Sequence, residues 1–339
     1  MWLQVVLLIV GFALLYYGAE WLVKGAANLA RSLGVTPVVI GLTVVAFGTS
    51  APELVVSVIS SLAGKSMIAV GNVVGSNICN IALVLGMAAF LIPLTADKSV
   101  VRRDIPLMLG ISVYLLILSM DSRITRLEGV TLFAGVILYT VFNYYISARE
   151  TRLAREASAR TDTEFAHGRE LIAEAEEELE EIGIIESRPK QILLIIFGIA
   201  GVVIGAQVLI DAAVVIMKTF GVSEKFIGLT IVALGTSLPE LATSMVAALR
   251  KEMDISIGNL IGSNVFNILS VIGLAGIVRP IPIPGGFFES GLVYDYLVML
   301  FVSLLPWLLM RGDYTIRRSG GFLLLCCYAG YMGYLVYTV

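Results

Sequence analysis

Two glutamates, Glu53 and Glu240, lie in matching stretches that are otherwise apolar enough to cross a membrane. The stretches read G-L-T-V-V-A-F-G-T-S-A-P-E-L at residues 41–54 and G-L-T-I-V-A-L-G-T-S-L-P-E-L at residues 228–241, and eleven of the fourteen positions are identical. A carboxylate at membrane depth costs roughly 2.5–3.5 kcal/mol on insertion scales. Because this cost recurs at matched positions, the pattern predicts a buried cation site.

Hydroxyl side chains precede each glutamate at helical spacing. In the first stretch, Thr49 lies four residues before Glu53 and Ser50 lies three residues before it. Such spacing gathers hydroxyl and carboxylate oxygens on one side of a helix. The second stretch repeats the arrangement with Thr236, Ser237 and Glu240.

A proline follows the hydroxyl pair in each stretch. Because Pro52 and Pro239 lack a backbone N–H and crowd the carbonyl four residues earlier, we expect each helix to break and to free the carbonyls of Gly48 and Gly235. Loosened backbone at membrane depth is tolerated where it lines a cavity. Freed carbonyl oxygens there suit a hard cation.

A second pair of motifs follows in the same register, G-N-V-V-G-S-N-I-C-N at residues 71–80 and G-N-L-I-G-S-N-V-F-N at residues 258–267. Residues 71 and 258, like residues 41 and 228, are 187 positions apart, so the chain contains two copies of one unit. The motif glycines favour close helix packing. Further oxygens come from Ser76, Asn80, Ser263 and Asn267, with Asn72, Asn77, Asn259 and Asn264 expected in supporting positions.

Together the motifs offer two carboxylates surrounded by hydroxyl and amide oxygens. Calcium takes six to eight oxygen ligands in flexible geometry, whereas magnesium keeps its water in a tighter octahedron. Two glutamates match the charge of one Ca²⁺, and Na⁺ can use the same oxygens. A site that holds either Ca²⁺ or Na⁺, but never both, provides the exclusion that antiport requires. A salt-bridge role for the glutamates is disfavoured, because the motif spans contain no basic residue.

The composition places these motifs in a polytopic membrane protein. Hydrophobic residues make up 58% of the 339 residues and charged residues only 14%, which excludes an ordinary soluble domain. Apolar runs long enough to cross a hydrocarbon core number ten, at roughly 3–30, 36–63, 67–92, 105–120, 127–147, 191–217, 226–249, 255–278, 291–310 and 318–338.

The ten runs divide into two five-helix units, residues 1–147 and 191–339, joined by a polar, acidic linker at residues 148–190. Because five is odd, the second unit must enter the bilayer upside down. Inverted repeats with broken helices at the midplane are the architecture of secondary transporters. The acidic run at residues 170–181 is expected to be a solvated linker helix rather than a calcium sensor.

Basic residues set the expected orientation. Seventeen Lys and Arg residues fall in connections on one side and six on the other. The positive-inside rule then places the linker in the cytoplasm and both termini outside, in the inner membrane. Within the first run, Glu20 and Lys24 are spaced to form a structural ion pair.

The only histidine, His167, and the three cysteines provide no set of metal ligands. We expect the lipid bilayer and the transported ions as partners, no nucleic acid, and no prosthetic group.

At these motifs the sequence resembles the calcium/cation antiporter superfamily, whose two repeats carry G-T-S-x-P-E followed by G-N-x-x-G-S-N. The resemblance spans essentially the whole chain and is strongest to the prokaryotic members of the sodium/calcium exchanger branch. The proton/calcium branch instead has a glutamate, in a G-N-x-x-E pattern, where this chain has Gly75 and Gly262.

The resemblance implies particular site residues. Glu53 and Glu240 would be the central ligands shared by Ca²⁺ and Na⁺, and Ala46 and Ala233 would offer backbone carbonyls. Members that need potassium, and some that do not, place an aspartate at the position of Asn267, and the loss of this negative charge argues against potassium co-transport. The remaining ligands would be Thr49, Ser50, Thr236, Ser237, Ser76, Asn80, Ser263 and Asn267.

We therefore expect an Na⁺/Ca²⁺ exchanger that works by alternating access. A H⁺/Ca²⁺ antiporter would use the same glutamates to trade calcium for protons, and a sodium gradient at fixed pH separates the two. A cation channel would conduct without a counter-ion. An intramembrane enzyme is disfavoured, because Ser50 has no histidine or lysine nearby in the sequence to activate it.

Overall fold

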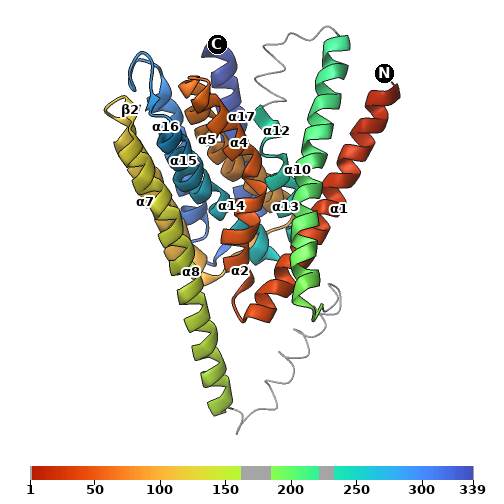
Figure 1. Cartoon of the computed structure of the whole chain (residues 1–339). Coiled ribbons are helices and arrows are strands. Elements are labelled where there is room, and N and C mark those ends of the chain that lie inside the picture. The colour runs from red at the N-terminus through yellow and green to blue at the C-terminus, as the bar shows by residue number, and fades with distance from the viewer. Residues whose placement is uncertain (1, 162–184, 221–232, 339) are drawn as a thin grey trace.

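The computed structural model describes residues 2–161, 185–220 and 233–338. Within these ranges the chain forms an all-helical membrane fold, in which long helices pack side by side and the strands are only two residues long (Figure 1). Both chain ends lie at the same end of the molecule. The predicted acidic helix at residues 170–181 lies outside the described residues.

The first half of the chain contains three unbroken long helices and several helices with an interruption. Its helical elements are α1 (Trp2–Leu33), α2 (Pro37–Ile40), η1 (Gly41–Val45), α3 (Ala46–Thr49), α4 (Ala51–Leu62), α5 (Ser66–Ile78), η2 (Cys79–Leu85), α6 (Gly86–Leu91), η3 (Val100–Asp104), α7 (Ile105–Ser119) and α8 (Arg126–Thr161). The elements named η are π-helical turns, which are rare and often mark functional sites.

The second half follows the same plan. Its helical elements are α10 (Arg188–Thr219), α12 (Ala233–Gly235), α13 (Leu238–Leu249), α14 (Met253–Phe266), η5 (Asn267–Ile272), α15 (Gly273–Val278), α16 (Leu292–Leu309) and α17 (Arg318–Thr338). Helix boundaries in the second half follow those of the first half at the same 187-residue offset as the motifs. For example, α4 and α13 are both twelve residues long and begin at residues 51 and 238.

Seven helices of the described residues are long and apolar enough to cross a membrane, or eight if one bent pair counts as a single span. These eight coincide with eight of the ten predicted runs. The run at 105–120 falls on α7, which has fifteen residues. The run at 226–249 includes residues that the structure does not describe.

The bent pair confirms the helix break predicted from Pro52. The helices Pro37–Thr49 and Ala51–Leu62 meet at an angle of 47°. Ser50, between them, has φ −81° and ψ 9°, in the bridge region of backbone conformations. Ser237 adopts a similar conformation, φ −92° and ψ 5°, immediately before α13. The first motif leaves the helix at Ser50 and the second at Thr236 and Ser237, and in both copies a new helix begins at the residue after the serine.

The centre of the molecule is built by α5 and α14 with the turns that continue them. Within the most apolar 18-residue stretch of each span, 78% is buried in Ser66–Leu91 and 83% in Met253–Val278. The corresponding share in the other unbroken spans is 17–33%. These two central spans carry the second motif pair. The outer spans expose large apolar side chains, as expected for contact with lipid.

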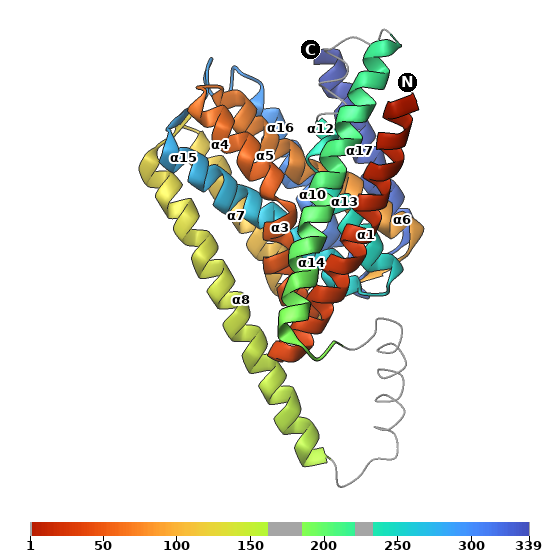
Figure 2. The same ribbon diagram turned by 45° about the vertical axis from the view of Figure 1, so that its right-hand side comes forward.

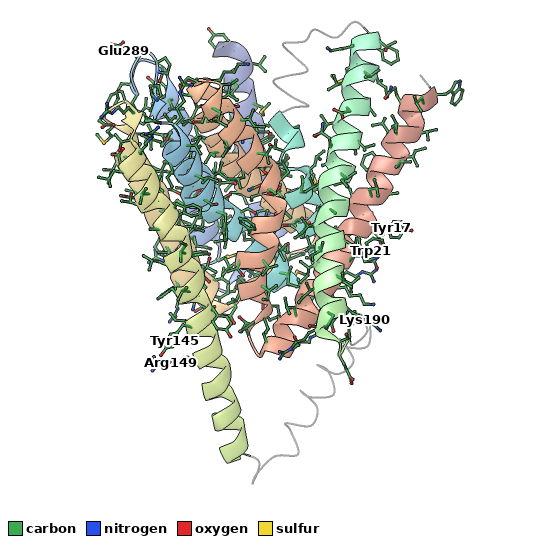
Figure 3. All side chains as sticks on the ribbon, in the orientation of Figure 1. Tyr17, Trp21, Tyr145, Arg149, Lys190 and Glu289 are labelled. Atoms are coloured by element: carbon green, nitrogen blue, oxygen red, sulfur yellow. The ribbon has the colours of Figure 1, made fainter. Side chains whose placement is uncertain are left out.

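Helices α1 and α10 form a closely packed pair at one side of the bundle (Figure 2). Glycines allow their backbones to touch: a Cβ added to Gly198 would lie 2.5 Å from the backbone nitrogen of Leu22, and one added to Gly18 would lie 2.7 Å from that of Val202. Small residues at such positions are typical of helix interfaces in membranes. The aromatic side chains of Tyr17 and Trp21 point away from this pair (Figure 3).

Two short antiparallel strand pairs connect the halves. Strand β1 (Leu94–Thr95) pairs with β4 (Thr315–Ile316), and β2 (Arg123–Ile124) pairs with β3 (Ile281–Pro282). Each pair joins a strand of the first half to one of the second half. The two halves are therefore joined by strand pairing as well as by helix packing.

Candidate cation site

The two motif glutamates occupy the first turns of the helices that follow the breaks. Glu53 is the third residue of α4 and Glu240 the third residue of α13. Both side chains are fully buried. The positive end of a helix dipole stabilises a carboxylate at its first turn, so the breaks reduce the cost of placing these charges inside the bundle.

Each glutamate is held by hydroxyl groups. The Ser76 Oγ donates to Glu53 Oε1 at 3.5 Å, and the Ser263 Oγ donates to Glu240 Oε1 at the same distance. A shorter bond crosses between the copies, from Ser50 Oγ to Glu240 Oε1 at 3.0 Å. The structure thus brings both copies of the motif together around one carboxylate pair.

The threonines of the broken helices take matching positions. Thr49 Oγ1 donates to Asn259 Oδ1 at 3.1 Å and also lies beside Glu240. Thr236 lies beside Glu53. Each threonine therefore neighbours the glutamate of the other copy.

Several oxygens at the site are buried without a hydrogen-bond partner among the described residues. They are Glu53 Oε2, Glu240 Oε2, Asn80 Oδ1, Asn267 Oδ1 and Ser237 Oγ. Buried polar atoms in folded proteins are nearly always paired, and leaving one unpaired costs free energy. Apart from the serine hydroxyl, all of these atoms can only accept. Oxygens of this kind can be satisfied by a cation, since hard cations take oxygen ligands.

An asparagine network fixes the direction of two of these oxygens. Asn80 donates from Nδ2 to Asn264 Oδ1, and Asn267 donates from Nδ2 to Asn77 Oδ1, both at 3.1 Å. Asn77 and Asn264 in turn each donate to the backbone carbonyl of the other at 3.2 Å. Because the Nδ2 groups of Asn80 and Asn267 are used in this network, their Oδ1 atoms point elsewhere. Both residues lie at the start of π-helical turns, η2 and η5.

A second pair of asparagines ties the broken helices to the central ones. Asn72 donates to Ser57 Oγ at 3.0 Å and to the backbone carbonyl of Glu53 at 3.3 Å. Asn259 donates to Ser244 Oγ at 3.0 Å. The sequence predicted the asparagines as supporting residues but missed the serines. The signal was present, because each serine lies four residues after its glutamate in both copies.

The two alanines expected to supply carbonyls lie at the start of short helices. Ala46 begins α3, and its carbonyl accepts from the Ser50 backbone N–H at 3.0 Å and from Thr49 Oγ1 at 3.4 Å. Ala233 begins α12. The carbonyl of Ala46 therefore contacts the serine and threonine of its own motif.

Close packing at the motif glycines differs between the copies. A Cβ on Gly258 would lie 2.8 Å from the Val38 carbonyl oxygen, and one on Gly262 would lie 2.6 Å from that of Leu42. For Gly71 and Gly75, nothing in the described ranges comes within 4 Å. The expected close approach is thus confirmed for the second copy.

No salt bridge reaches the two glutamates from any described lysine or arginine, as the four bridges found there lie elsewhere. The described part of the chain also contains no group of three His, Cys, Asp or Glu side chains arranged to hold a metal. The site consists of two carboxylates and neutral oxygens, which suits a hard cation.

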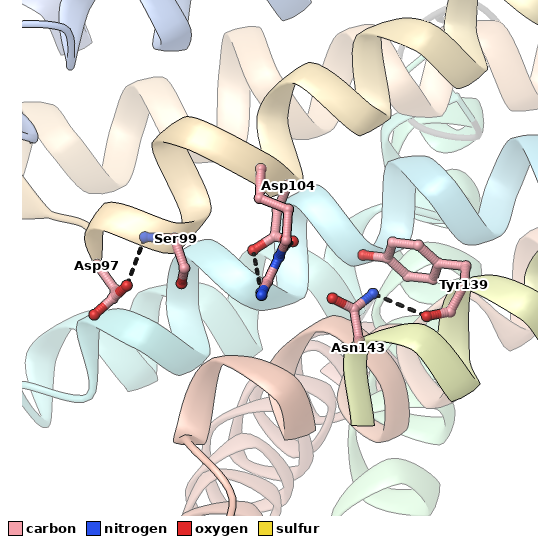
Figure 4. A network of polar contacts seen from close by, with 6 residues as sticks. Asp97, Ser99, Asp104, Tyr139 and Asn143 are labelled. Carbon is pink, nitrogen blue, oxygen red and sulfur yellow. Dashed lines mark hydrogen bonds and ion pairs between the residues drawn. The ribbon is translucent and has the colours of Figure 1, made fainter. Parts of the chain in front are cut away.

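A further buried carboxylate, Asp104, lies in a different polar cluster (Figure 4). Arg103 Nε donates to Asp104 Oδ1 at 2.9 Å, so the carboxylate charge is paired. Tyr139 and Asn143 of α8 lie nearby, and Asn143 Nδ2 donates to the Tyr139 carbonyl at 3.0 Å. Sequence reasoning did not single out this cluster, because nothing in the repeated motifs points to it.

Comparison with known proteins gives consistent matches over the whole chain. A family model described as "Sodium/calcium exchanger protein" matches residues 3–145 and 190–337. The inner membrane protein YrbG of Escherichia coli (strain K12) is 38% identical over 305 residues, which cover 90% of this chain and 88% of YrbG. The sodium/calcium exchanger MaX1 of Methanosarcina acetivorans is 33% identical, with 98% of each chain covered.

A solved structure shows the same likeness. The sodium-calcium exchanger NCX_Mj, soaked with zero Na⁺ and Ca²⁺, superposes with a TM-score of 0.80 at 31% identity, covering 98% of this chain and 99% of that chain. The likeness therefore includes both halves of the molecule and their arrangement.

Proposed function

The chain belongs to the sodium/calcium exchanger protein family, and on this premise we propose that it exchanges Na⁺ for Ca²⁺ across the inner membrane by alternating access. Its multi-pass helical fold and its family are those of membrane transporters of cations rather than of enzymes. The observation that carries the proposal is the set of buried, unpartnered oxygens centred on Glu53 and Glu240 in the described part of the chain.

In the proposed site, Glu53 Oε2 and Glu240 Oε2 bind the ion directly. The Oδ1 atoms of Asn80 and Asn267 and the Ser237 hydroxyl complete its oxygen shell, since they are buried and have no partner among the described residues. Further oxygens for Ca²⁺ or Na⁺ come from Ala46, Thr49, Ser50, Ser76, Ala233, Thr236 and Ser263. An all-oxygen shell with two carboxylates neutralises one Ca²⁺ and matches its preference for several oxygen ligands.

Exchange follows from the charge of this site. Two carboxylates without a cation repel one another in a water-poor interior, where charges interact more strongly than in water. One Ca²⁺ or more than one Na⁺ relieves that repulsion, and the same oxygens cannot hold both. Without a bound cation, this repulsion disfavours the closed conformation through which the site must pass to face the other side of the membrane. The protein therefore changes sides only with ions bound, and transport is an exchange.

The proposed topology is ten helices in two inverted five-helix repeats, residues 1–147 and 191–339, with a cytoplasmic linker at 148–190. The 187-residue recurrence of helix bounds supports two repeats. Arg149 and Lys190, at the two ends of the linker, lie toward the end of the molecule away from the chain termini, whereas Glu289 lies at the terminal end (Figure 3). The position of these two basic residues agrees with a cytoplasmic linker.

In the proposed motion, α1 and α10 move together against the rest of the bundle. Their mutual contact is extensive and rests on glycine backbones, so they are expected to move as one body. The pair packs on α13, α2 and α3, which are themselves parts of the broken helices. Its displacement would open the site to one side and close it to the other.

The test is uptake of radiolabelled Ca²⁺ into proteoliposomes loaded with Na⁺, compared with choline-loaded vesicles at the same pH on both sides. Uptake that requires internal Na⁺ supports the proposal. Uptake that ignores Na⁺ but follows an imposed pH gradient would show instead that the glutamates exchange calcium for protons. Uptake that needs neither gradient would indicate a channel.

A further inference from the structure

We propose that two ion pairs between α1 and the turn after α13 form a latch that holds the cytoplasmic side of the transporter closed. The latch consists of Glu20 with Arg250 and Arg31 with Glu252. This inference rests on the proposed alternating-access function and identifies the residues that set which side the cation site faces.

Both ion pairs join segments that are far apart in the sequence. Arg250 Nη2 contacts Glu20 Oε1, across 230 positions. Arg31 Nη2 lies 3.4 Å from Glu252 Oε1, across 221 positions. Arg250 and Glu252 flank Lys251 in the turn between α13 and α14, and Lys251 has a positive φ of 60°. The turn thus presents one positive and one negative group to complementary charges on α1.

The contact between α1 and α13 beneath these pairs is rich in small side chains. The buried residues of α1 are mostly glycine and alanine, and those of α13 include Ala247 and Ala248. Small side chains let helix backbones approach closely but offer no directional partner. Ion pairs with defined partners are therefore the features that fix the position of α1 along α13.

Pairs of opposite charge are absent at the equivalent positions of the other copy. At the 187-residue offset, the counterparts of Glu20 and Arg250 are Gln207 and Ala63, and those of Arg31 and Glu252 are Lys218 and Lys65. The first counterpart pair carries no charge, and the second carries two charges of the same sign. Opposite charges at both positions therefore occur on one face only, and in the proposed topology this is the cytoplasmic face.

The latch is connected to the cation site through a single helix. Glu240 lies in the first turn of α13, and Arg250 follows its last residue. A helix of twelve residues spans about 18 Å, so α13 leads from the site to the turn that α1 contacts. When the latch is closed, α1 covers this helix at the cytoplasmic end. When it opens, the cytoplasmic route to the site becomes available.

The first test measures the half-saturating Ca²⁺ concentration on each face separately, in proteoliposomes with uniformly oriented protein. Glu20→Gln and Arg250→Gln are compared with the charge swap Glu20→Arg/Arg250→Glu. The matched control is Asp313→Asn, which breaks the exposed Asp313–Arg317 pair within one loop.

We expect each single variant to lower the ratio of the cytoplasmic to the outer half-saturating Ca²⁺ concentration by about two- to fivefold. A change of this size is expected from the loss of one partly exposed ion pair. The reason is that a larger population of cytoplasm-facing protein raises apparent affinity on that face. The charge swap should restore the wild-type ratio, and the control should leave it unchanged. An unchanged ratio in both single variants, or a swap that does not restore it, would overturn the latch.

A second measurement needs no transport. Spin labels at Leu33→Cys on α1 and Gly312→Cys in the loop before α17, with Cys326 and Cys327 replaced by serine, report the distance between α1 and the bundle. We expect Glu20→Gln to shift the distance distribution toward longer values, and the charge swap to reverse the shift. If the wild-type protein shows no exchange, the proposed function fails. The distances still show whether the ion pair between Glu20 and Arg250 holds α1 in place. Identical distributions in the variant and the wild type would refute it.

Discussion

Ser50 donates a hydrogen bond from its Oγ to Oε1 of Glu240 at 3.0 Å, although the two residues are 190 positions apart. The bond joins the break of the first copy to the carboxylate of the second. Neither copy therefore assembles the site alone, and the duplication is part of the site's construction. Any change at one break is expected to alter the carboxylate of the other copy.

Removing the charge of either glutamate should abolish transport. We expect Glu53→Gln and Glu240→Gln each to lower Ca²⁺ uptake to the level of protein-free vesicles, because one carboxylate cannot neutralise a divalent ion. Glu289→Gln, at an exposed loop away from the site, is the matched control and should transport normally. Uptake at more than half the wild-type rate in either site variant would exclude that glutamate as a central ligand.

The Ser50 hydrogen bond should contribute to ion affinity. Hydrogen bonds to charged groups are worth about 1.5–3 kcal/mol, so Ser50→Ala is expected to weaken Ca²⁺ binding by about tenfold or more. Isothermal titration in detergent measures the change. Ser60→Ala on the helix that follows Ser50 serves as the control. Equal affinities for the Ser50 variant and the control would mean that this hydroxyl does not orient Glu240 for binding.

A third carboxylate should change the balance between the ions. Asn267→Asp keeps the size of the side chain but adds a charge next to the proposed ion. We expect tighter Ca²⁺ binding and slower exchange, because an excess of negative charge holds the divalent ion more strongly. Binding and turnover measured on one preparation separate these effects. Weaker Ca²⁺ binding in a folded variant would place the Asn267 oxygen outside the ion's shell.

The glycine contact between α1 and α10 should be essential for folding. A Cβ on Gly198 would lie 2.5 Å from the Leu22 backbone, so Gly198→Leu forces the helices apart. We expect this variant to lose most of its monodisperse fraction in size-exclusion chromatography. Gly330→Leu, where nothing described lies within 4 Å of an added Cβ, should behave like wild type. Normal behaviour of Gly198→Leu would show that the pair tolerates separation.

The sequence predicted which residues lie together better than it predicted the contacts between them. Matched motifs singled out Glu53, Glu240 and their hydroxyl neighbours, because a carboxylate inside an apolar span is costly, and the structure brings these residues together. Their role as cation ligands stays a prediction. The helix break at Pro52 followed from local chemistry. The π-helical turns at Asn80 and Asn267 were not predicted, since they depend on how the central helices cross.

Contacts between the copies could not be read from spacing. The exchange of hydrogen bonds between Asn77 and Asn264 joins residues 187 positions apart, and only the packed bundle brings them together. The expected ion pair of Glu20 with Lys24 was wrong, because Glu20 instead pairs with Arg250. An arginine from another helix reached the carboxylate, and helical spacing within one segment gives no sign of such a partner.

The most direct test of the account is competition between Na⁺ and Ca²⁺ for one site, measured by equilibrium binding of radiolabelled Ca²⁺ to purified protein. If both ions share one site, Na⁺ displaces all bound Ca²⁺, with a dependence on Na⁺ concentration steeper than that for one ion. The Glu53→Gln/Glu240→Gln protein then binds no Ca²⁺ above background. Ca²⁺ binding that persists at saturating Na⁺, or that survives in the double variant, would contradict a single shared site built on these two glutamates.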